Sequence, residues 1–105
     1  MSNEDIENII IGVKLIYMKE IMNIADSDRR QYYNELVASV PDNPLHGYNN
    51  PRKALIMAKK IGGFFETMRL EMVNDGIDVS NIEKEIEENN NMFRKALHVP
   101  KWVKL

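Results

Sequence analysis

Apolar residues recur at helical spacing in four stretches of the chain, and short runs rich in proline, glycine or polar residues separate these stretches. The apolar side chains fall three and four positions apart, whereas a half-buried strand would alternate apolar and polar residues. The pattern predicts helices near residues 4–25, 27–39, 51–75 and 80–98, and no strands. We therefore expect one all-α domain over residues 1–105, folded as a compact bundle of about four helices.

Three helix ends carry recognisable signals. Asn50 precedes Pro51, which suits an N-cap followed by proline at the first helical position, where the missing N–H costs nothing. Ser80 and Glu83 have the spacing of a capping box at the start of the last helix. Gly76 suits the left-handed residue that closes the third helix.

The first predicted helix is apolar almost all round, and its polar or small residues form one narrow stripe of Asp5, Asn8, Gly12, Lys19 and Asn23. A helix of this kind is normally buried on most sides, and three other helices from a chain this short would cover about two of its faces. We expect another copy of the chain, or a different protein, to cover the rest, and we favour a homodimer. The expected interface residues are Ile6, Ile9, Ile10, Val13, Ile16, Tyr17 and Ile21.

The third predicted helix has an apolar seam with the spacing of a packed helix–helix interface. The seam comprises Ala54, Ala58, Ile61, Phe65, Met68 and Met72. Gly62 and Gly63 interrupt its middle, at about 1 kcal/mol of helix propensity each. Two interpretations stay open for the glycine pair: a kink or close backbone approach, or a hinge or ligand contact.

Charge is unevenly distributed along the chain. The net charge is −2, but residues 51–75 carry five basic and three acidic side chains. A positive edge on one helix can contact the phosphates of nucleic acid even where the whole chain is acidic. An ordinary amphipathic helix with a solvated basic edge is the alternative. The candidate nucleic-acid contacts are Arg52, Lys53, Lys59, Lys60 and Arg69.

Residues 54–72 also resemble the helix-turn-helix motif of DNA-binding regulators. Ala58, Ile61 and Gly62 supply the small residue, the apolar residue and the turn glycine at the offsets of that motif. The stretch departs from the motif at Glu71, which stands where an apolar core residue belongs, and its would-be recognition residues offer few donors to base edges. The resemblance implies a DNA-binding regulator as the alternative function.

Two segments outside the helices carry further candidate contacts. The loop at 41–50 is long for a helix connection, so it either binds a partner or acts as a rigid connector. The tail at 99–105 is too apolar to be left in water, and we expect it to dock on its own chain, on a neighbouring copy, or in a partner as a recognition peptide. The candidate partner contacts in these segments are Leu45, His46, Tyr48 and Trp102.

The composition argues against most catalytic chemistry. The absence of cysteine excludes disulfides, thiolate nucleophiles and cysteine-bound metal ions. His46 and His98 are the two histidines, and neither has a second ligand at the spacing that metal sites use. The sequence has no glycine-rich phosphate loop and no nucleophile elbow. We expect no catalytic residue, no bound metal and no cofactor.

The remaining sequence features concern location and role. No apolar run approaches the roughly 20 residues of a membrane span, and no signal peptide opens the chain, so we expect no membrane contact. The lack of cysteine leaves the cytoplasm as the default location. The small size, the lack of cysteine and a composition rich in Ile, Asn and Lys would suit a low-GC bacterial or phage accessory protein. Together these features predict a small, non-enzymatic interaction or regulatory protein that acts as a helical oligomer and binds a protein partner.

Overall fold

Four helices make up the fold. The computed structural model describes residues 2–97, with side chains placed as far as residue 88. No strand occurs in this part of the chain, so the predicted all-α bundle of about four helices is confirmed. The helices are α1 (Asn3–Ile21), α2 (Ser27–Ala38), α3 (Pro51–Asn74) and α4 (Ser80–Leu97).

The helix starts follow from local hydrogen bonds of the kinds that the sequence signals. At α3 the Asn50 side chain accepts hydrogen bonds from the backbone amides of Arg52 at 2.9 Å and Lys53 at 3.4 Å, as expected of an N-cap. At α1, Ser2 and Asp5 form a capping box that the sequence analysis overlooked, with both hydrogen bonds between 3.1 and 3.2 Å. Asp26 caps α2 by accepting from the Arg29 amide at 3.0 Å.

The capping box predicted at Ser80 was wrong by one position. The Glu83 amide donates to the Val79 carbonyl at 2.9 Å. A cap by the Ser80 hydroxyl would need this same amide as its donor, but the amide is already used by the first hydrogen bond of the helix. The Asp78 carboxylate instead accepts from the Ser80 amide at 2.9 Å, and this hydrogen bond lowers the pKa of Asp78.

The end of α3 is closed as predicted. Gly76 has a φ of 78°, in the left-handed region that glycine adopts readily. The Gly76 amide donates to the Val73 carbonyl at 2.9 Å and the Ile77 amide to the Met72 carbonyl at 3.0 Å. These two bonds complete a Schellman motif, which satisfies carbonyls that the helix end would otherwise leave free.

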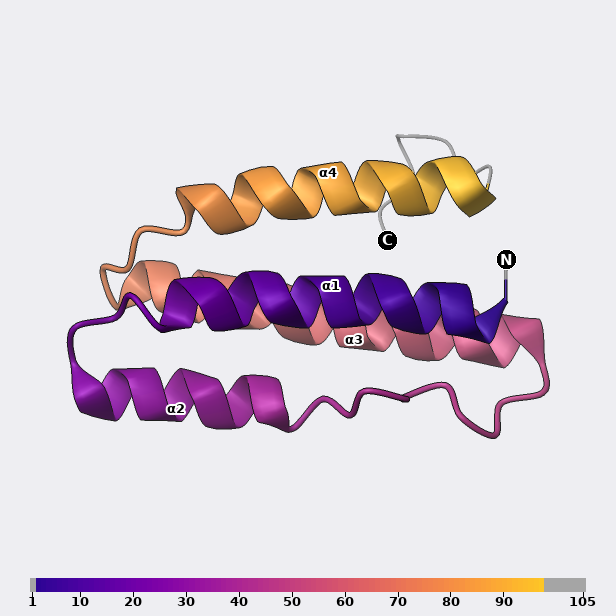
Figure 1. Cartoon of the computed structure of the whole chain (residues 1–105), viewed down its shortest axis with the longest axis horizontal. Coiled ribbons are helices and arrows are strands. Elements are labelled where there is room, and N and C mark those ends of the chain that lie inside the picture. Colours follow the sequence, from indigo (N-terminus) through magenta and orange to yellow (C-terminus); the bar gives the residue numbers. More distant parts are fainter. Residues whose placement is uncertain (1, 98–105) are drawn as a thin grey trace.

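α1 is the central helix of the bundle and contacts each of the other three. Figure 1 shows α4 and α2 on either side of α1, with α3 behind it, in a molecule with extents of 41 × 29 × 17 Å. One short chain thus covers three sides of α1, one more than the sequence analysis allowed for. This central position explains why three sides of α1 are apolar.

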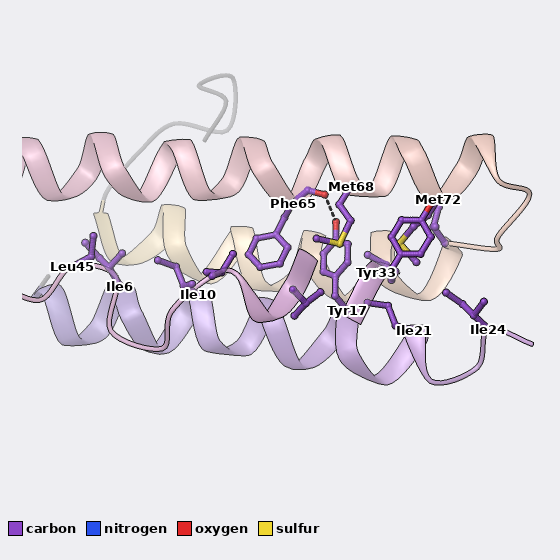
Figure 2. Close-up of a cluster of buried hydrophobic side chains, with 14 of the residues drawn as sticks. Ile6, Ile10, Tyr17, Ile21, Ile24, Tyr33, Leu45, Phe65, Met68 and Met72 are labelled. Atoms are coloured by element: carbon purple, nitrogen blue, oxygen red, sulfur yellow. Dashed lines mark hydrogen bonds between the residues drawn. The ribbon is translucent and has the colours of Figure 1, made fainter. Parts of the chain in front are cut away.

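The core gathers side chains from all four helices and from the α2–α3 connection (Figure 2). Tyr17 and Ile21 of α1 are fully buried, as are Tyr33 of α2, Met72 of α3 and Ile82 of α4. The apolar seam predicted along α3 lies on this inner side. Ala54, Phe65, Met68 and Met72 are buried, and Ala58 and Ile61 are partly buried against the core.

Candidate interaction surface

The residues expected to form an oligomer interface lie on the inner side of α1. Ile6, Ile10, Tyr17 and Ile21 are buried within the chain itself. Ile9, Val13 and Ile16 are partly buried and pack against the same core. The four buried side chains are not open to a second copy, because the helices of their own chain already cover them. The strongly exposed apolar side chains of α1 lie on the opposite side of that helix.

That opposite side carries three strongly exposed apolar side chains. Leu15 is 59% exposed, Met18 44% and Met22 67%. Ile11, one turn before Leu15, is half-buried. The spacing of four, three and four places these residues along one side of the helix. We refer to Ile11, Leu15, Met18 and Met22 as the outer α1 face.

The lysines that border the outer α1 face are tied to neighbouring elements. The Lys14 ammonium donates to the Val40 carbonyl at 2.6 Å and to the Asp42 carboxylate at 3.0 Å, which fastens the start of the α2–α3 connection. Lys19 lies 3.6 Å from the Glu85 carboxylate of α4. The lysines at the edges of the outer α1 face thus already have partners, and the four residues of the face itself are all apolar.

A second set of exposed apolar residues lies on α3 but forms no continuous surface. Ile56, Leu70 and Val73 are each about half exposed. Ile56 and Leu70 are 14 positions apart, or about 21 Å along the helix. The exposed side chains of Lys59 and Lys60 follow Ile56. The outer α1 face is therefore the more compact apolar surface.

The glycine pair of α3 neither interrupts the helix nor makes a close approach within the described chain. Gly62 and Gly63 lie inside one uninterrupted helix and are exposed. A Cβ added at either position would meet nothing within 4 Å. The packing of the described residues therefore does not require glycine at either position.

Tyrosine side chains tie α1 and α2 to α3. The Tyr17 hydroxyl donates to the Phe65 carbonyl at 2.7 Å, and the two rings lie 5.0 Å apart (Figure 2). The Tyr33 hydroxyl donates to the Asp75 carboxylate. Burial raises the pKa of Tyr17, and burial together with the Asp75 carboxylate raises the pKa of Tyr33. Both phenols are thereby held in the neutral form.

Four of the five basic candidates on α3 form an open edge. Arg52, Lys53, Lys59 and Lys60 are exposed, and none of them makes an ion pair with another residue in the described part of the chain. Arg52 and Lys53 lie in the first turn of α3, where the helix dipole adds positive potential, and Lys59 and Lys60 follow about two turns later. These four cationic side chains are therefore open to solvent along the first half of α3.

Arg69 does not belong to this basic edge. Its guanidinium pairs with Glu66 at 2.5 Å and with Glu83 of α4 at 2.7 Å. The hydrogen bond to the Glu66 carboxylate is the largest of the effects that raise the pKa of Arg69. This residue joins α3 to α4, so its inclusion among the nucleic-acid contacts is corrected.

The helix-turn-helix resemblance was also wrong. Residues 54–72 lie within α3, where a helix-turn-helix would place two helices and a turn. Gly62, the expected turn residue, is helical. A glycine costs about 1 kcal/mol in a helix interior, which is too little to break a helix that buries an apolar seam along its length.

The α2–α3 loop behaves as a connector. Leu45 is fully buried in the core and is therefore not a partner contact. Asn3 donates to the Tyr48 carbonyl at 2.7 Å, which fixes the loop against the start of α1. His46 is exposed and Tyr48 half-buried, and both border a shallow hollow of about 410 Å³ together with Lys53. The fourth candidate, Trp102, lies outside the described residues.

The described residues contain no group of three His, Cys, Asp or Glu side chains placed to hold a metal ion. Within the same part of the chain, no helix combines the length and the apolar character that crossing a bilayer would require. The outer α1 face and the basic edge of α3 are thus the two surface features that stand out.

Comparison with known proteins adds no further assignment. No protein-family model matches the chain, and neither the curated proteins nor the solved structures contain a significant match.

Proposed function

We propose that this chain acts by binding protein, and that it binds through the outer α1 face. The observation that carries the proposal is the exposure of Leu15, Met18 and Met22 along one side of the central helix. Large apolar side chains grouped on one surface are typical of protein–protein interfaces. A second copy of the chain is the partner that we expect, with a dimer as the first assembly.

The chemistry of this face suits a protein partner. Two of its four residues are methionines, whose flexible and polarisable side chains adapt to partner surfaces. The face runs about 17 Å along α1 from Ile11 to Met22, and the bordering lysines already have partners. Apolar contact at the centre with polar groups at the rim is the usual arrangement of an interface.

We assign the protein a regulatory or accessory role and not a catalytic one. The support is the absence of a metal-binding cluster among the described residues, together with the lack of any cysteine in the sequence. We also propose a bacterial or phage source and a cytoplasmic location, on the basis of the composition alone.

Replacing Leu15 with aspartate tests this proposal. The wild-type chain is expected to gain mass with concentration in light scattering, whereas Leu15→Asp should raise the dissociation constant at least about tenfold, because association would bury an unpaired carboxylate. Ile56→Asp is the matched control, since Ile56 is 49% exposed on α3 and should leave the mass curve unchanged. Equal curves for Leu15→Asp and the wild type would contradict the proposed face.

Binding to nucleic acid is the second candidate function. It is supported by the four exposed basic residues of α3, which lack carboxylate partners within the described chain. Such an edge would contact phosphates without reading the sequence of bases, since lysine and arginine neutralise the backbone charge. The acidic net charge of −2 implies weak binding that is sensitive to salt.

A salt titration of a double variant tests this second candidate. If the edge binds DNA, Lys59→Glu with Lys60→Glu should lower affinity and reduce the slope of log affinity against log salt by about 2, because two phosphate contacts are lost. Fluorescence anisotropy of a labelled duplex measures both quantities. Lys84→Glu is the control, since Lys84 is an exposed lysine on α4. A wild-type chain that does not bind the duplex at low salt would contradict this function.

A further inference from the structure

The outer α1 face is left uncovered by every described element. α2, α3 and α4 contact the other sides of α1, and α4 and α2 flank it without crossing it (Figure 1). Water therefore meets Leu15, Met18 and Met22 unless some part of the chain beyond the described residues covers them. An occupant from the same chain would have the advantage of high effective concentration.

The course of α4 brings the end of the described chain to the start of α1. The two helices run in opposite directions, and the last turn of α4 lies beside the first turn of α1 (Figure 1). Trp102 comes five residues after Leu97 and Leu105 comes eight residues after it, and extended chains of these lengths span about 16–18 Å and about 26–29 Å. Leu15 lies about 18 Å along α1 from Asn3. The C-terminal residues can therefore reach the outer α1 face of their own chain.

The chemistry of the last five residues matches that of the surface within their reach. They read Lys-Trp-Val-Lys-Leu, with two cations among three apolar side chains. The first turns of α1 carry Glu4, Asp5 and Glu7, and no described lysine or arginine makes an ion pair with them. One oxygen of Glu7 is buried without a hydrogen-bond partner among the described residues. The outer α1 face and the acidic first turns of α1 thus lie within reach of an apolar segment that carries positive charge.

We propose that residues 101–105 cover the outer α1 face of their own chain and must leave it before a second copy or another protein binds there. Trp102, the sole tryptophan, would supply the largest apolar contact, and Lys101, which precedes it, would approach the acidic start of α1. The competition with a partner rests on the proposed function, but the docking of the tail does not.

The fluorescence of Trp102 tests the docking directly, because no other tryptophan contributes to the signal. In the full chain, Leu15→Asp is expected to shift the emission to longer wavelength and to increase quenching by acrylamide, since it exposes the indole to water. Ile56→Asp should change neither property. Identical emission and quenching in all three proteins would overturn the docking site. A wild-type emission that shifts to longer wavelength on dilution would overturn docking within one chain, since it would place Trp102 on a second copy. Release of the tail by a second copy predicts the opposite shift, because dilution would return Trp102 to its own chain.

Light scattering of Trp102→Ala separates the docking from the proposed function. A weakened tail should let the full-length variant associate at lower concentration than the wild type, because an intramolecular competitor has been removed. A Trp102→Ala chain that associates no better than the wild type would overturn the competition. If Trp102 is protected by Leu15 but neither protein associates, the docking stands and the proposed self-association fails.

Discussion

Alanine in place of Tyr17 is expected to lower the free energy of unfolding by about 3–5 kcal/mol, the range for removing a large aromatic side chain from a core. Tyr17 is fully buried on the central helix and touches the Phe65 ring of α3. Its loss would leave a cavity at the centre of the bundle. A total stability of about 5–15 kcal/mol is usual for a domain, so this one change would remove a large share of it.

Urea denaturation followed by circular dichroism measures the effect, and phenylalanine provides the control. Tyr17→Phe keeps the ring against Phe65 and removes the hydrogen bond to the Phe65 carbonyl, which is 2.7 Å long. Its cost should be about 1 kcal/mol. An alanine variant no less stable than the phenylalanine variant would contradict the central place of the ring in the core.

The second large effect is a loss of stability in alkali. The pKa values of Tyr17 and Tyr33 in the folded protein lie above the ordinary value of 10, so the unfolded chain loses these protons first. The stabilisation is complete below pH 10 and falls as the pH rises toward the folded pKa values. Each phenol can lower the free energy of unfolding by up to about 1.4 kcal/mol per pH unit in that interval.

Urea titrations at several pH values between 8 and about 11.5 would reveal this loss. The double variant Tyr17→Phe, Tyr33→Phe has no phenol at either position, so its stability should decline less steeply above pH 10. The comparison is made between slopes, because the double variant is expected to be less stable at neutral pH. A double variant that declines as steeply as the wild type would show that other groups cause the alkaline loss.

Local patterns in the sequence were sufficient to predict the helices and several of their ends. The N-cap at Asn50 and the left-handed Gly76 depend on residues within a few positions of each helix end, so short-range chemistry determines them. α4 starts at Ser80, as predicted, but the predicted capping box does not form, and Asp78, outside the predicted motif, accepts the hydrogen bond from the Ser80 amide. Helix ends of this kind are decided by competition among neighbouring polar side chains.

The side of α1 that remains exposed could not be predicted in the same way. Ile10 and Leu15 are equally apolar, yet Ile10 is buried and Leu15 is 59% exposed. Periodicity separates apolar from polar positions, but on a helix that is apolar nearly all round it does not identify which apolar positions meet a neighbour. Only the placement of α2, α3 and α4 around α1 makes that distinction.

The basic residues of α3 show the same dependence on tertiary contacts. Arg69 and Lys59 have the same formal charge in the sequence, but Arg69 reaches Glu83 on α4 and Lys59 pairs with no described carboxylate. Glu83 lies 14 positions after Arg69, and the turn between α3 and α4 brings the two together. The pairing of a charged side chain is thus a property of the fold.

The most direct test of the outer α1 face as the binding surface is a dilution series followed by nuclear magnetic resonance of backbone amides, which a 12.2 kDa chain suits well. We expect the amide shifts that change with concentration to cluster at Ile11, Leu15, Met18 and Met22, while those of Ile56 and Leu70 on α3 stay constant. Changes that cluster on α3, or a dimer that forms without any shift along α1, would contradict the account.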